Sequence, residues 1–490
     1  MNTLIFTLLL GTPVTGSILC AVFHRRRALE AITVASACAT FVSALWLMSA
    51  VMRQTTLSTP QALWYADGLS AYMVLIVCGS TLVVALYSIG YLRRQVLSKK
   101  VDGRQLWLYY LLLNVFLFTM MLVLLSNNLG FLWIGSEATT LATALLVAFY
   151  ERESSIEAAW KYVIICSVGI ALALFGIILT YFSALHVVPA VVNPLNWSSL
   201  MHVAKELDPS VLKLAFIFIL IGFGTKAGLA PMHTWKPDAY SEAPAPISAL
   251  MAAGLVNVAL YSLMRFYILV NTALGTGYAS TLFMIFGLVS MGIAVPFMLL
   301  QRSFKRLLAY SSVEHAGIIL FALGIGTPLA YFGAMLHVLN NAIAKVLLFL
   351  TASNFRLAYS SKIMHKITGA IKVIPVSATF LIVGVFALTG WPPFGPFVSE
   401  FAIVSAGFSS GTVVPSILFI GFVATIFAGF IYYASRMVLG EPQSPVTGGD
   451  ADAFSLVLLG VLLAALLLLG VFIPGPLYEC IQNAAGVLKS

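Results

Sequence analysis

Long apolar stretches separated by short polar segments make up most of the chain. A helix needs about 20 mostly apolar residues to cross a bilayer, and fourteen such stretches can be placed along the 490 residues. The pattern predicts an all-α, polytopic membrane protein of about 14 transmembrane helices. The predicted spans are 2–23, 29–52, 69–92, 106–125, 127–150, 157–183, 210–230, 245–270, 277–300, 305–326, 328–353, 374–407, 412–436 and 453–474.

Two of these spans, the seventh and the twelfth, are interrupted by proline. Span 7 breaks at Pro231 after Lys226, and span 12 breaks at Pro392-Pro393 before Glu400, five spans later. Two copies offset by an odd number of helices must be inverted in the membrane, and inverted repeats with discontinuous helices are a common transporter architecture. The sequence therefore predicts two inverted five-helix repeats with broken helices 7 and 12.

The breaks also suggest how the chain is divided. Residues 1–105 are expected to hold helices 1–3, and residues 106–270 the first repeat with helices 4–8. Residues 277–437 are expected to form the second, inverted repeat with helices 9–13. Residues 438–490 then add helix 14 and a short tail.

Composition supports the membrane location and predicts an orientation. The chain is 61% hydrophobic and only 9% charged, which excludes a soluble core. The net charge is +9, but 18 of the 26 Lys and Arg residues lie in loops on one side of the predicted bundle. The positive-inside rule places those loops in the cytoplasm. We expect a bacterial or archaeal-type cytoplasmic membrane, both termini on the outer side, and no nucleic-acid partner.

No motif for redox or nucleotide chemistry is present. The five cysteines stand singly, without a CxxC pair or a His/Cys cluster. No P-loop, dinucleotide-binding glycine pattern or haem-attachment motif occurs. The sequence predicts no cofactor, no metal and no catalytic residue of its own. Energy for any ion movement must come from a gradient or from a partner.

Glu137 and Lys226 are ionisable residues at membrane depth. Glu137 lies about ten residues into its span, roughly 15 Å below the surface. A charge inside a span costs about 3 kcal/mol on insertion scales, so such residues usually pair and mark an ion or proton path. Because burial shifts the pKa of lysine readily, the pair is predicted to be a switchable proton carrier. A purely structural, hydrogen-bonded carboxylate is the alternative for Glu137.

A second group of polar residues lies in spans 11 and 12. His337, Asn341 and Lys345 are spaced at i, i+4 and i+8, which places them on one helix face. A relay of side chains and waters along that face is predicted, although a single histidine is more often a satisfied core residue. Glu400 is interpreted as the entry or exit carboxylate of the path, with a cap of the second half-helix as the alternative.

Other polar residues allow two interpretations each. His233 and Asp238 either shape the broken loop of span 7 or gate the path. Glu314 and His315 form a polar island in span 10 with a structural or a relay role. Arg265 lies near a span end, where we expect its side chain to extend to the interface in a structural role.

Several motifs together resemble a known family. They are Tyr87-Ser-Ile-Gly-Tyr91, Ser126-Asn-Asn-Leu129, Glu137-Ala-Thr-Thr-Leu141, Glu157-Ala-Ala-Trp-Lys-Tyr162, Gly224-Thr-Lys-Ala-Gly-Leu-Ala-Pro-Met-His233, Ser241-Glu-Ala-Pro-Ala-Pro246, Lys305-Arg-Leu-Leu-Ala-Tyr-Ser-Ser-Val-Glu314 and Ser399-Glu-Phe401. The whole chain resembles the antiporter-like subunits of respiratory complex I, membrane-bound hydrogenases and cation/proton antiporter complexes. Its details are most similar to the hydrogenase-4 component F branch, of the formate hydrogenlyase type.

The resemblance implies a fold, a role and partners. It implies fourteen helices with two inverted repeats, a modulating Glu137–Lys226 pair, and a proton path through span 11 towards Glu400. It also implies other membrane subunits, iron–sulfur and nickel–iron subunits on the cytoplasmic side, and membrane lipid as partners.

The sequence departs from the family pattern at five positions. Asn257 holds the place where relatives carry a lysine or histidine in span 8, as in the hydrogenase-4 branch. Asn341 replaces a common histidine, and Lys236 replaces an apolar residue, so both are further candidates for a gate or relay. Tyr240 and Trp391 also differ from the usual residues. These changes leave the route of the path open.

Two functions of different classes follow. The first is a proton-translocating subunit of a redox complex, driven by electron transfer in partner subunits. The alternative is a subunit of a gradient-driven cation/proton antiporter or proton-powered uptake system without redox chemistry. A scaffold with an inactive channel is disfavoured because Glu137, Lys226, Lys345 and Glu400 are all present.

Overall fold

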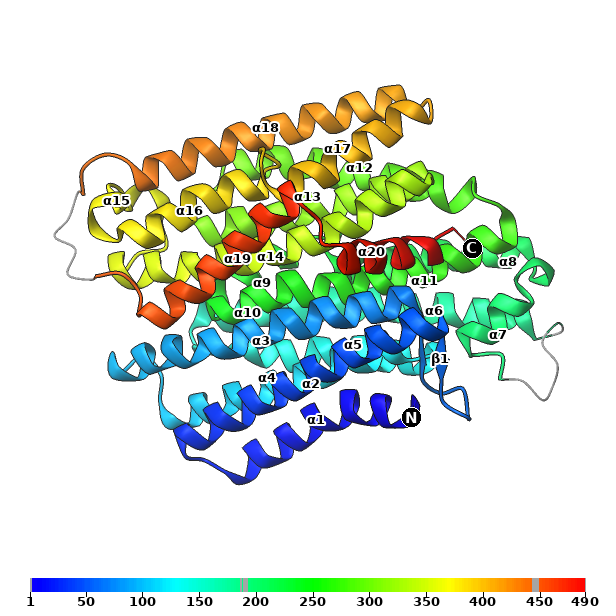
Figure 1. Ribbon diagram of the computed structural model, residues 1–490, viewed down its shortest axis with the longest axis horizontal. Coiled ribbons are helices and arrows are strands. Elements are labelled where there is room, and N and C mark those ends of the chain that lie inside the picture. Colours follow the sequence, from blue (N-terminus) through cyan, green and yellow to red (C-terminus); the bar gives the residue numbers. More distant parts are fainter. Residues whose placement is uncertain (1, 186, 188–192, 443–448, 490) are drawn as a thin grey trace.

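The protein is a bundle of membrane-length helices (Figure 1). The computed structural model describes residues 2–185, 187, 193–442 and 449–489. Within these residues, 13 helices are long and apolar enough to cross a membrane. A further crossing is broken into two shorter helices, α16 (Pro375–Leu388) and α17 (Gly395–Ser409). The predicted all-α polytopic fold is confirmed.

The first part of the chain holds the helices up to the eighth crossing. They are α1 (Asn2–Val22), α2 (Arg26–Gln54), α3 (Gly68–Leu97), α4 (Gly103–Leu125), α5 (Leu129–Val147), α6 (Glu153–Ala184), α7 (Trp197–His202), the short η1 (Ala204–Glu206), α8 (Pro209–Ala227), α9 (Trp235–Glu242), α10 (Ala245–Leu250) and α11 (Val256–Leu274). A two-stranded hairpin, β1 (Leu57–Ser58) and β2 (Tyr65–Ala66), precedes α3. A π-helical turn, η2 (Met251–Leu255), joins α10 and α11 into one crossing.

The second part repeats the alternation of long and broken helices. Besides α16 and α17, it contains α12 (Tyr278–Leu299), α13 (Phe304–Ile325), α14 (Pro328–Tyr359), η3 (Met364–Lys366), α15 (Ala370–Val373), α18 (Val413–Val438), α19 (Ala453–Val471) and α20 (Gly475–Val487). Figure 1 shows α1 and α18 at opposite edges of the bundle, with α19 and α20 lying across it.

Local sequence sets the ends of the helices that carry the polar residues. The Asp208 carboxylate caps α8 by accepting from the Ser210 and Val211 N–H groups, and Pro209 occupies the first turn, where no N–H is needed. The helix ends at Gly228, which adopts the left-handed conformation (φ 71°) common at helix C-termini.

Both predicted helix breaks are present. The seventh crossing stops at Ala227, four residues before Pro231, and the chain continues as α9. The twelfth crossing stops at Leu388 and resumes at Gly395. The α8 helix packs against α6, and α16 and α17 pack against α14. The pairing of a broken helix with a continuous one therefore occurs once in each half, while the exact division into inverted repeats stays a prediction.

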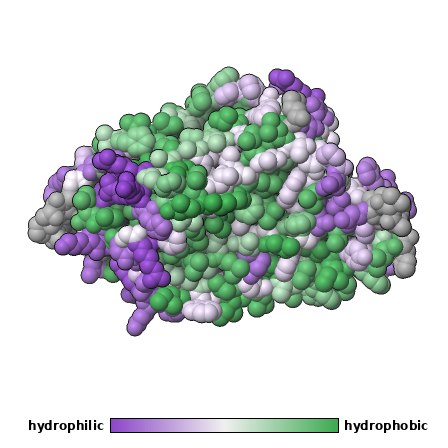
Figure 2. Space-filling model, turned by 90° about the horizontal axis from the view of Figure 1, so that it is seen from below, coloured by the Kyte–Doolittle hydropathy of each residue, from purple (hydrophilic) through white to green (hydrophobic). Residues whose placement is uncertain are grey.

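Three crossings form the interior of the bundle. The α13 helix and the α10–η2–α11 crossing are buried on every side, and α14 is almost so. Polar side chains on these helices therefore cannot reach lipid and must find partners inside the protein. Hydrophilic residues gather at the two ends of the molecule, with a mostly hydrophobic band between them (Figure 2).

The predicted short C-terminal tail is helical. The residues after the last crossing form α20, which packs on α3 and α14. Pro474 precedes this helix and Pro476 lies in its first turn, a position that tolerates proline. The helix is too short to span a bilayer, and for this reason the hydropathy pattern did not reveal it.

Candidate functional site

Glu137 lies on α5 and faces α6. Its Oε1 accepts a hydrogen bond of 2.6 Å from the Ser167 hydroxyl, and its Oε2 is buried without a partner among the described residues. The carboxylate is thus held at one oxygen only. A buried carboxylate oxygen without a donor is costly unless water or a cation reaches it.

Lys226 is buried near the end of α8. Its ammonium donates a hydrogen bond to the Thr140 hydroxyl, and it lies 5.8 Å from the centre of the Tyr162 ring. No ion pair joins Lys226 to Glu137 in the described part of the chain. Thr140 is three residues after Glu137 on α5. The Lys226 ammonium is therefore hydrogen-bonded about one helical turn from the carboxylate that is predicted to modulate its protonation.

Lys236 is completely buried at the start of α9. Its Nζ donates to two backbone carbonyls, that of Ala227 at 2.8 Å and that of Ser312 at 3.0 Å. Ala227 follows Lys226 in the chain, whereas Ser312 belongs to α13 of the second half. The Lys236 ammonium therefore links the two halves of the polar interior.

The close fit of Lys236 depends on Gly228. A Cβ atom at this position would lie 2.7 Å from the Lys236 Cδ, in a backbone conformation that side chains rarely adopt. The glycine that ends α8 therefore also leaves room for the buried lysine.

The predicted polar face of α14 is present and points at α13. Lys345 is fully buried and donates to the Ser311 hydroxyl and, at 3.3 Å, to the Leu308 carbonyl. One residue further along α13, Ser312 offers the carbonyl that Lys236 binds. Glu314 is buried on the same helix as Ser311, and no ion pair joins it to Lys345 in the described part of the chain. The Asn341 Oδ1 is buried without a partner in the described residues.

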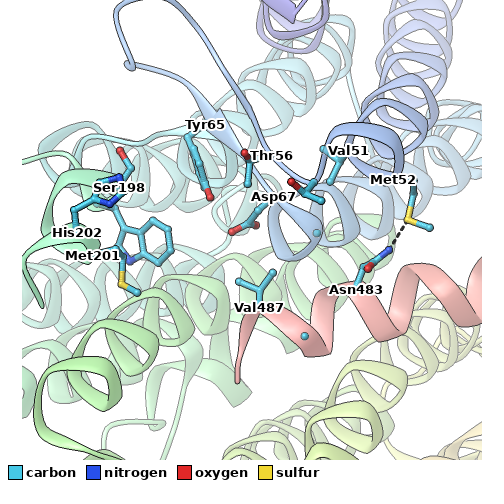
Figure 3. Close-up of a pocket in the computed structure, with 14 residues that line it drawn as sticks. Val51, Met52, Thr56, Tyr65, Asp67, Ser198, Met201, His202, Asn483 and Val487 are labelled. Carbon is cyan, nitrogen blue, oxygen red and sulfur yellow. Dashed lines mark hydrogen bonds between the residues drawn. The ribbon is translucent and has the colours of Figure 1, made fainter. Parts of the chain in front are cut away.

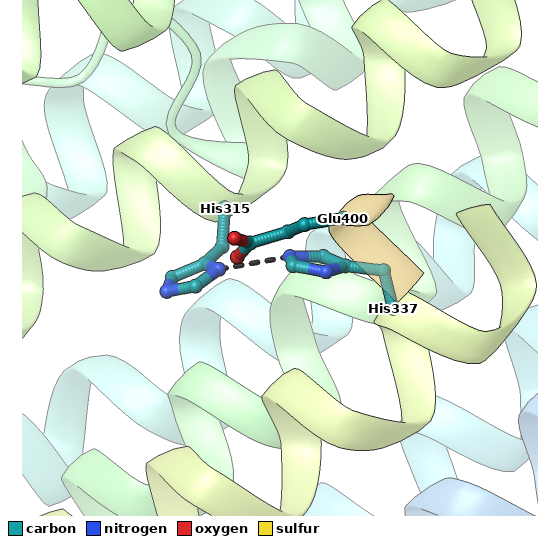
Figure 4. Close-up of side chains that lie close together, drawn as sticks. All are labelled: His315, His337 and Glu400. Atoms are coloured by element: carbon teal, nitrogen blue, oxygen red, sulfur yellow. Dashed lines mark hydrogen bonds between the residues drawn. The ribbon is translucent and has the colours of Figure 1, made fainter. Parts of the chain in front are cut away.

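Two histidines bring α13 and α14 together further along the bundle (Figure 4). The His315 Nδ1 and the His337 Nε2 are 2.9 Å apart, and the His337 Nδ1 is 3.0 Å from the Ser399 hydroxyl. Ser399 donates its own proton to the Pro396 carbonyl at 2.8 Å. A hydroxyl has one proton, so His337 donates from Nδ1 to Ser399, and a neutral His337 accepts from His315 at Nε2.

Glu400 completes this group from the second half-helix. It lies on α17, five residues after the helix begins, so it does not cap that helix. Its carboxylate and the two imidazoles each offer an atom within 4.8 Å of the others. The carboxylate also lines a cavity of about 310 Å³ whose other walls include Trp391 and Phe401.

The backbone at Gly390 is shaped around Glu400. A Cβ atom at Gly390 would lie 2.2 Å from the Glu400 Oε2, and its φ is +68°. The loop that breaks span 12 therefore comes so close to the Glu400 carboxylate that only glycine fits at position 390.

His315, His337 and Glu400 are the types of ligand that bind zinc. Tetrahedral zinc with bonds of about 2.0–2.1 Å would hold two imidazole nitrogens about 3.3 Å apart. The observed 2.9 Å is a hydrogen-bond distance. The distance therefore fits a hydrogen bond between the two imidazoles, and the relay predicted for this segment stays a prediction.

The other sequence-predicted residues lie elsewhere. Asp238 forms ion pairs with Arg306 at 2.8 Å and with Lys161 at 3.4 Å, and so fastens α9 to α13 and α6. His233 is buried between the Phe297 and Tyr310 rings, and its Nδ1 has no partner in the described residues. Neither side chain joins the buried lysines and histidines, which favours a structural role for both.

Arg265 was expected to have a structural role at the membrane interface, but its side chain does not extend there. Its side chain is 3% exposed and forms an ion pair with Asp67, with hydrogen bonds of 2.6 and 2.7 Å. The guanidinium also stacks on Trp197, 4.4 Å from the ring centre. The sequence did not single out Asp67, because its partner lies 198 residues away.

The Asp67–Arg265 pair lies beside a cavity of about 600 Å³, lined by Tyr65, Asp67 and His202 among others (Figure 3). Burial alone would raise the pKa of Asp67, but the Arg265 charge and the hydrogen bonds from Arg265 and Ser70 outweigh it and lower the pKa. The pair is therefore fully ionised and fixes α3 to α11.

Asn257 lies next to the π-helical turn of the eighth crossing. Its Nδ2 donates to the Ala253 carbonyl at 2.7 Å, and its Oδ1 is buried without a partner among described residues. Single π-helical turns inside α-helices occur frequently at functional sites. The position expected to carry a lysine or histidine in relatives is thus polar here but carries no charge.

The fold and the buried polar residues define a class of protein: a polytopic membrane protein with ionisable groups crossing its interior. Residues 126–428 match the family model described as "NADH:quinone oxidoreductase/Mrp antiporter, TM". Residues 59–97 match the one described as "NADH-Ubiquinone oxidoreductase (complex I), chain 5 N-terminus".

Individual relatives agree with these matches. A hydrogenase-4 component F homolog from Methylacidiphilum infernorum is 37% identical over 438 residues, covering 88% of this chain and 90% of the relative. A chain of the archaeal membrane-bound sulfane sulfur reductase superposes with a TM-score of 0.88 at 22% identity, covering 100% of this chain and 98% of that one. A chain of the Mrp complex from Dietzia sp. DQ12-45-1b gives 0.87 at 18% identity, covering 100% and 97%.

The chain belongs to the NADH:quinone oxidoreductase/Mrp antiporter family of membrane subunits. It is an antiporter-like, multi-pass subunit of the complex I and membrane-bound hydrogenase group, as the sequence motifs indicated. Its relatives are subunits of multisubunit membrane complexes.

Proposed function

We propose that this chain is the proton-translocating membrane subunit of a multisubunit redox complex of the hydrogenase-4/formate hydrogenlyase or complex I type. The observation that carries the proposal is the row of buried ionisable side chains that runs through both halves. It comprises Lys226, Lys236, Lys345, His315, His337 and Glu400, preceded by the half-buried Glu137.

Charges at membrane depth are expensive and are usually retained for function. The three lysines of the row have hydroxyl or carbonyl acceptors instead of carboxylate partners. Hydroxyls and carbonyls stabilise a protonated lysine less than an adjacent carboxylate does, so each lysine can release its proton when a neighbouring positive charge approaches. This property suits stepwise proton transfer.

Glu137 and Lys226 would be the switch of this mechanism. A conformational change that brings the free Glu137 oxygen to the Lys226 ammonium holds the lysine protonated, and separation releases the proton towards Lys236. The proton then passes to Lys345 and, through His315 and His337, to Glu400. Asn341 and Glu314 would hold water and charge along this segment.

The chain has no redox motif, so partners must supply the energy. Moving one charge against 100 mV requires about 2.3 kcal/mol. Electron transfer in iron–sulfur and nickel–iron subunits on the side of the basic loops would provide it. By the positive-inside rule that side is the cytoplasm, and both termini lie outside.

The direct test is to purify the tagged chain from its native membrane in mild detergent and identify the co-purifying proteins by mass spectrometry. Nickel–iron and iron–sulfur subunits are expected. Lys226→Met in that complex should abolish proton uptake by vesicles while electron transfer persists or slows. Lys213→Met, an exposed lysine on the same helix, is the matched control and should leave proton uptake unchanged.

The likeness to a chain of the Mrp complex supports a second candidate, a gradient-driven cation/proton antiporter subunit. The same purification distinguishes the redox-complex subunit from the antiporter subunit. Recovery of other transporter subunits, without any iron–sulfur or nickel–iron protein, would contradict the redox proposal and support the antiporter.

A further inference from the structure

A basic cavity lies at the end of the bundle that carries the Lys- and Arg-rich loops. Its volume is about 390 Å³, and it is enclosed by the end of α12, the η3 turn and α18. The lining includes two arginines, one histidine and two tyrosines, and no carboxylate. The lining residues are Leu299, Leu300, Gln301, Arg302, Met364, His365, Thr368, Tyr432, Tyr433 and Arg436.

The two tyrosines and Arg436 form a fixed wall on α18. Arg436 donates to the Tyr432 hydroxyl at 2.7 Å, and its guanidinium lies 5.4 Å from the centre of the Tyr432 ring. The Tyr433 hydroxyl donates to the Leu299 carbonyl, which joins α18 to the end of α12. The Arg436 charge is therefore oriented without being neutralised.

The opposite wall is held by backbone pairing. The Met364 N–H donates to the Arg302 carbonyl at 2.8 Å, and Ser303 pairs with Ile363 as an isolated β-bridge. These bonds fix the loop after α12 against η3, so Arg302 and His365 come to the same cavity. Neither arginine has an ion-pair partner in the described part of the chain.

The nearby carboxylates on this side of the membrane are already paired. Glu242 binds Lys362 at 2.9 Å, Glu441 binds Lys372, and Asp238 binds Arg306 and Lys161. Within the described residues, no carboxylate therefore pairs with Arg302 or Arg436. A cavity with two unneutralised guanidinium groups, an imidazole and tyrosine hydroxyls has the chemistry of a phosphate site.

The apolar border of the cavity distinguishes a lipid phosphate from a soluble one. The cavity opens where two membrane-crossing helices end, and exposed apolar side chains border it directly. Leu300 is 77% exposed at its edge, and Phe297 and Tyr432 are exposed beside it. A dissolved anion would gain nothing from contact with this apolar border, whereas the acyl chains of a phospholipid would pack along it.

We propose that this cavity binds the phosphate headgroup of an anionic phospholipid, with Arg302 and Arg436 on the phosphate and the acyl chains along α12 and α18. Such a lipid would connect η3, which follows α14, to α18 and α12. Removing both arginines is expected to weaken binding of the anionic lipid by about tenfold or more.

The test uses the purified full chain, delipidated and offered equal amounts of phosphatidylglycerol and phosphatidylcholine with identical acyl chains, with bound lipid read by native mass spectrometry. Arg302→Gln/Arg436→Gln should lose the preference for phosphatidylglycerol. The matched control is Arg25→Gln/Arg104→Gln, two exposed arginines just before α2 and in the first turn of α4, and it should keep the preference. Equal binding by both double variants would overturn the proposal.

Two further arms exclude other ligands. Inorganic phosphate and glycerol 3-phosphate should not displace the bound lipid at millimolar concentration, and displacement would assign the cavity to a soluble anion instead. A photo-crosslinking residue at Leu300 should give lipid-sized adducts in the native membrane, whereas a crosslinked protein would show that a partner subunit fills the cavity. Because the Arg302 side chain has no partner within the described structure, Arg302→Gln alone should fold normally and still weaken the lipid preference.

Discussion

At the scale of single residues, the buried lysines are notable for what they bind. Lys226, Lys236 and Lys345 donate to hydroxyl and carbonyl oxygens, and no carboxylate pairs with any of them among the described residues. A buried charge held in this way is stabilised less than one in an ion pair, so its protonation responds strongly to a neighbouring charge. The three side chains are therefore suited to exchanging a proton along the row.

Lys236 provides the sharpest test at this scale. Lys236→Met in the intact complex should reduce proton uptake per electron transferred by at least about tenfold, because the charge that links Ala227 to Ser312 is removed. Replacing a buried charge by an apolar side chain of similar length is often neutral or stabilising, so the thermal stability should not fall. Proton uptake is measured by dye quenching in inverted vesicles, alongside the electron-transfer rate.

The control for this change is Lys213→Met, which removes an exposed lysine from α8. Unchanged proton uptake in Lys236→Met, with the protein folded, would show that Lys236 only satisfies backbone carbonyls. The path between the two halves would then have to run through Asn257 and water.

At the scale of secondary-structure elements, one ion pair connects helices that are distant in sequence. Asp67 caps α3 by accepting from the Ser70 N–H at 3.0 Å and also binds Arg265 of α11. The same carboxylate thus caps the N-terminus of α3 and forms an ion pair with α11. Sequence patterns describe the cap but contain no information about the partner.

Asp67→Asn isolates the value of that ion pair, because asparagine is an equally good helix cap. Leaving Arg265 buried without its partner should cost about 3–5 kcal/mol. The change should lower the melting temperature of the purified chain clearly more than Asp102→Asn, which alters the exposed cap of α4. Similar melting temperatures for the two variants would contradict a stabilising role of the pair.

The pair also sets a pH dependence. Since the pKa of Asp67 is lower in the folded protein than in the unfolded chain, its contribution is complete above the usual aspartate value of about 3.9 and is lost as the pH falls below it. The difference in melting temperature between wild type and Asp67→Asn should therefore persist at neutral pH and shrink under strong acid.

At the scale of the whole molecule, the distribution of the basic loops and the positions of the chain ends both fit an even number of membrane crossings. The basic loops gather at one end of the bundle, and both labelled chain ends in Figure 1 lie towards the other end. The hydrophobic band of Figure 2 separates the two ends. This arrangement requires an even number of crossings, which the α16–α17 crossing completes in addition to the 13 membrane-length helices of the described residues.

Labelling of single cysteines tests the orientation that we propose. In a variant with its five cysteines replaced, Gly277→Cys should react with a membrane-impermeant maleimide in intact cells, since the outer side is accessible there. Lys100→Cys, in a basic loop, should react only after permeabilisation. Both positions are exposed, so accessibility to solvent is matched. The reverse pattern would place the basic loops outside.

The sequence by itself determined the crossings, the two breaks and most of the ionisable residues at membrane depth, among them Lys226, Lys345 and Glu400. Hydropathy and proline positions are local properties, and a charge within an apolar run is visible without knowledge of its neighbours. The spacing of His337, Asn341 and Lys345 likewise fixed their shared face of α14, because helix periodicity alone sets it.

Only the tertiary structure decided which of these residues meet. It joined Lys236 to Ser312, His315 to His337 and Asp67 to Arg265, pairs whose members lie 76, 22 and 198 residues apart. It also showed that Lys226 binds Thr140 and that α20 folds back on α3 and α14. Such contacts depend on how whole helices pack, and packing results from the combined burial of many side chains that no local pattern encodes.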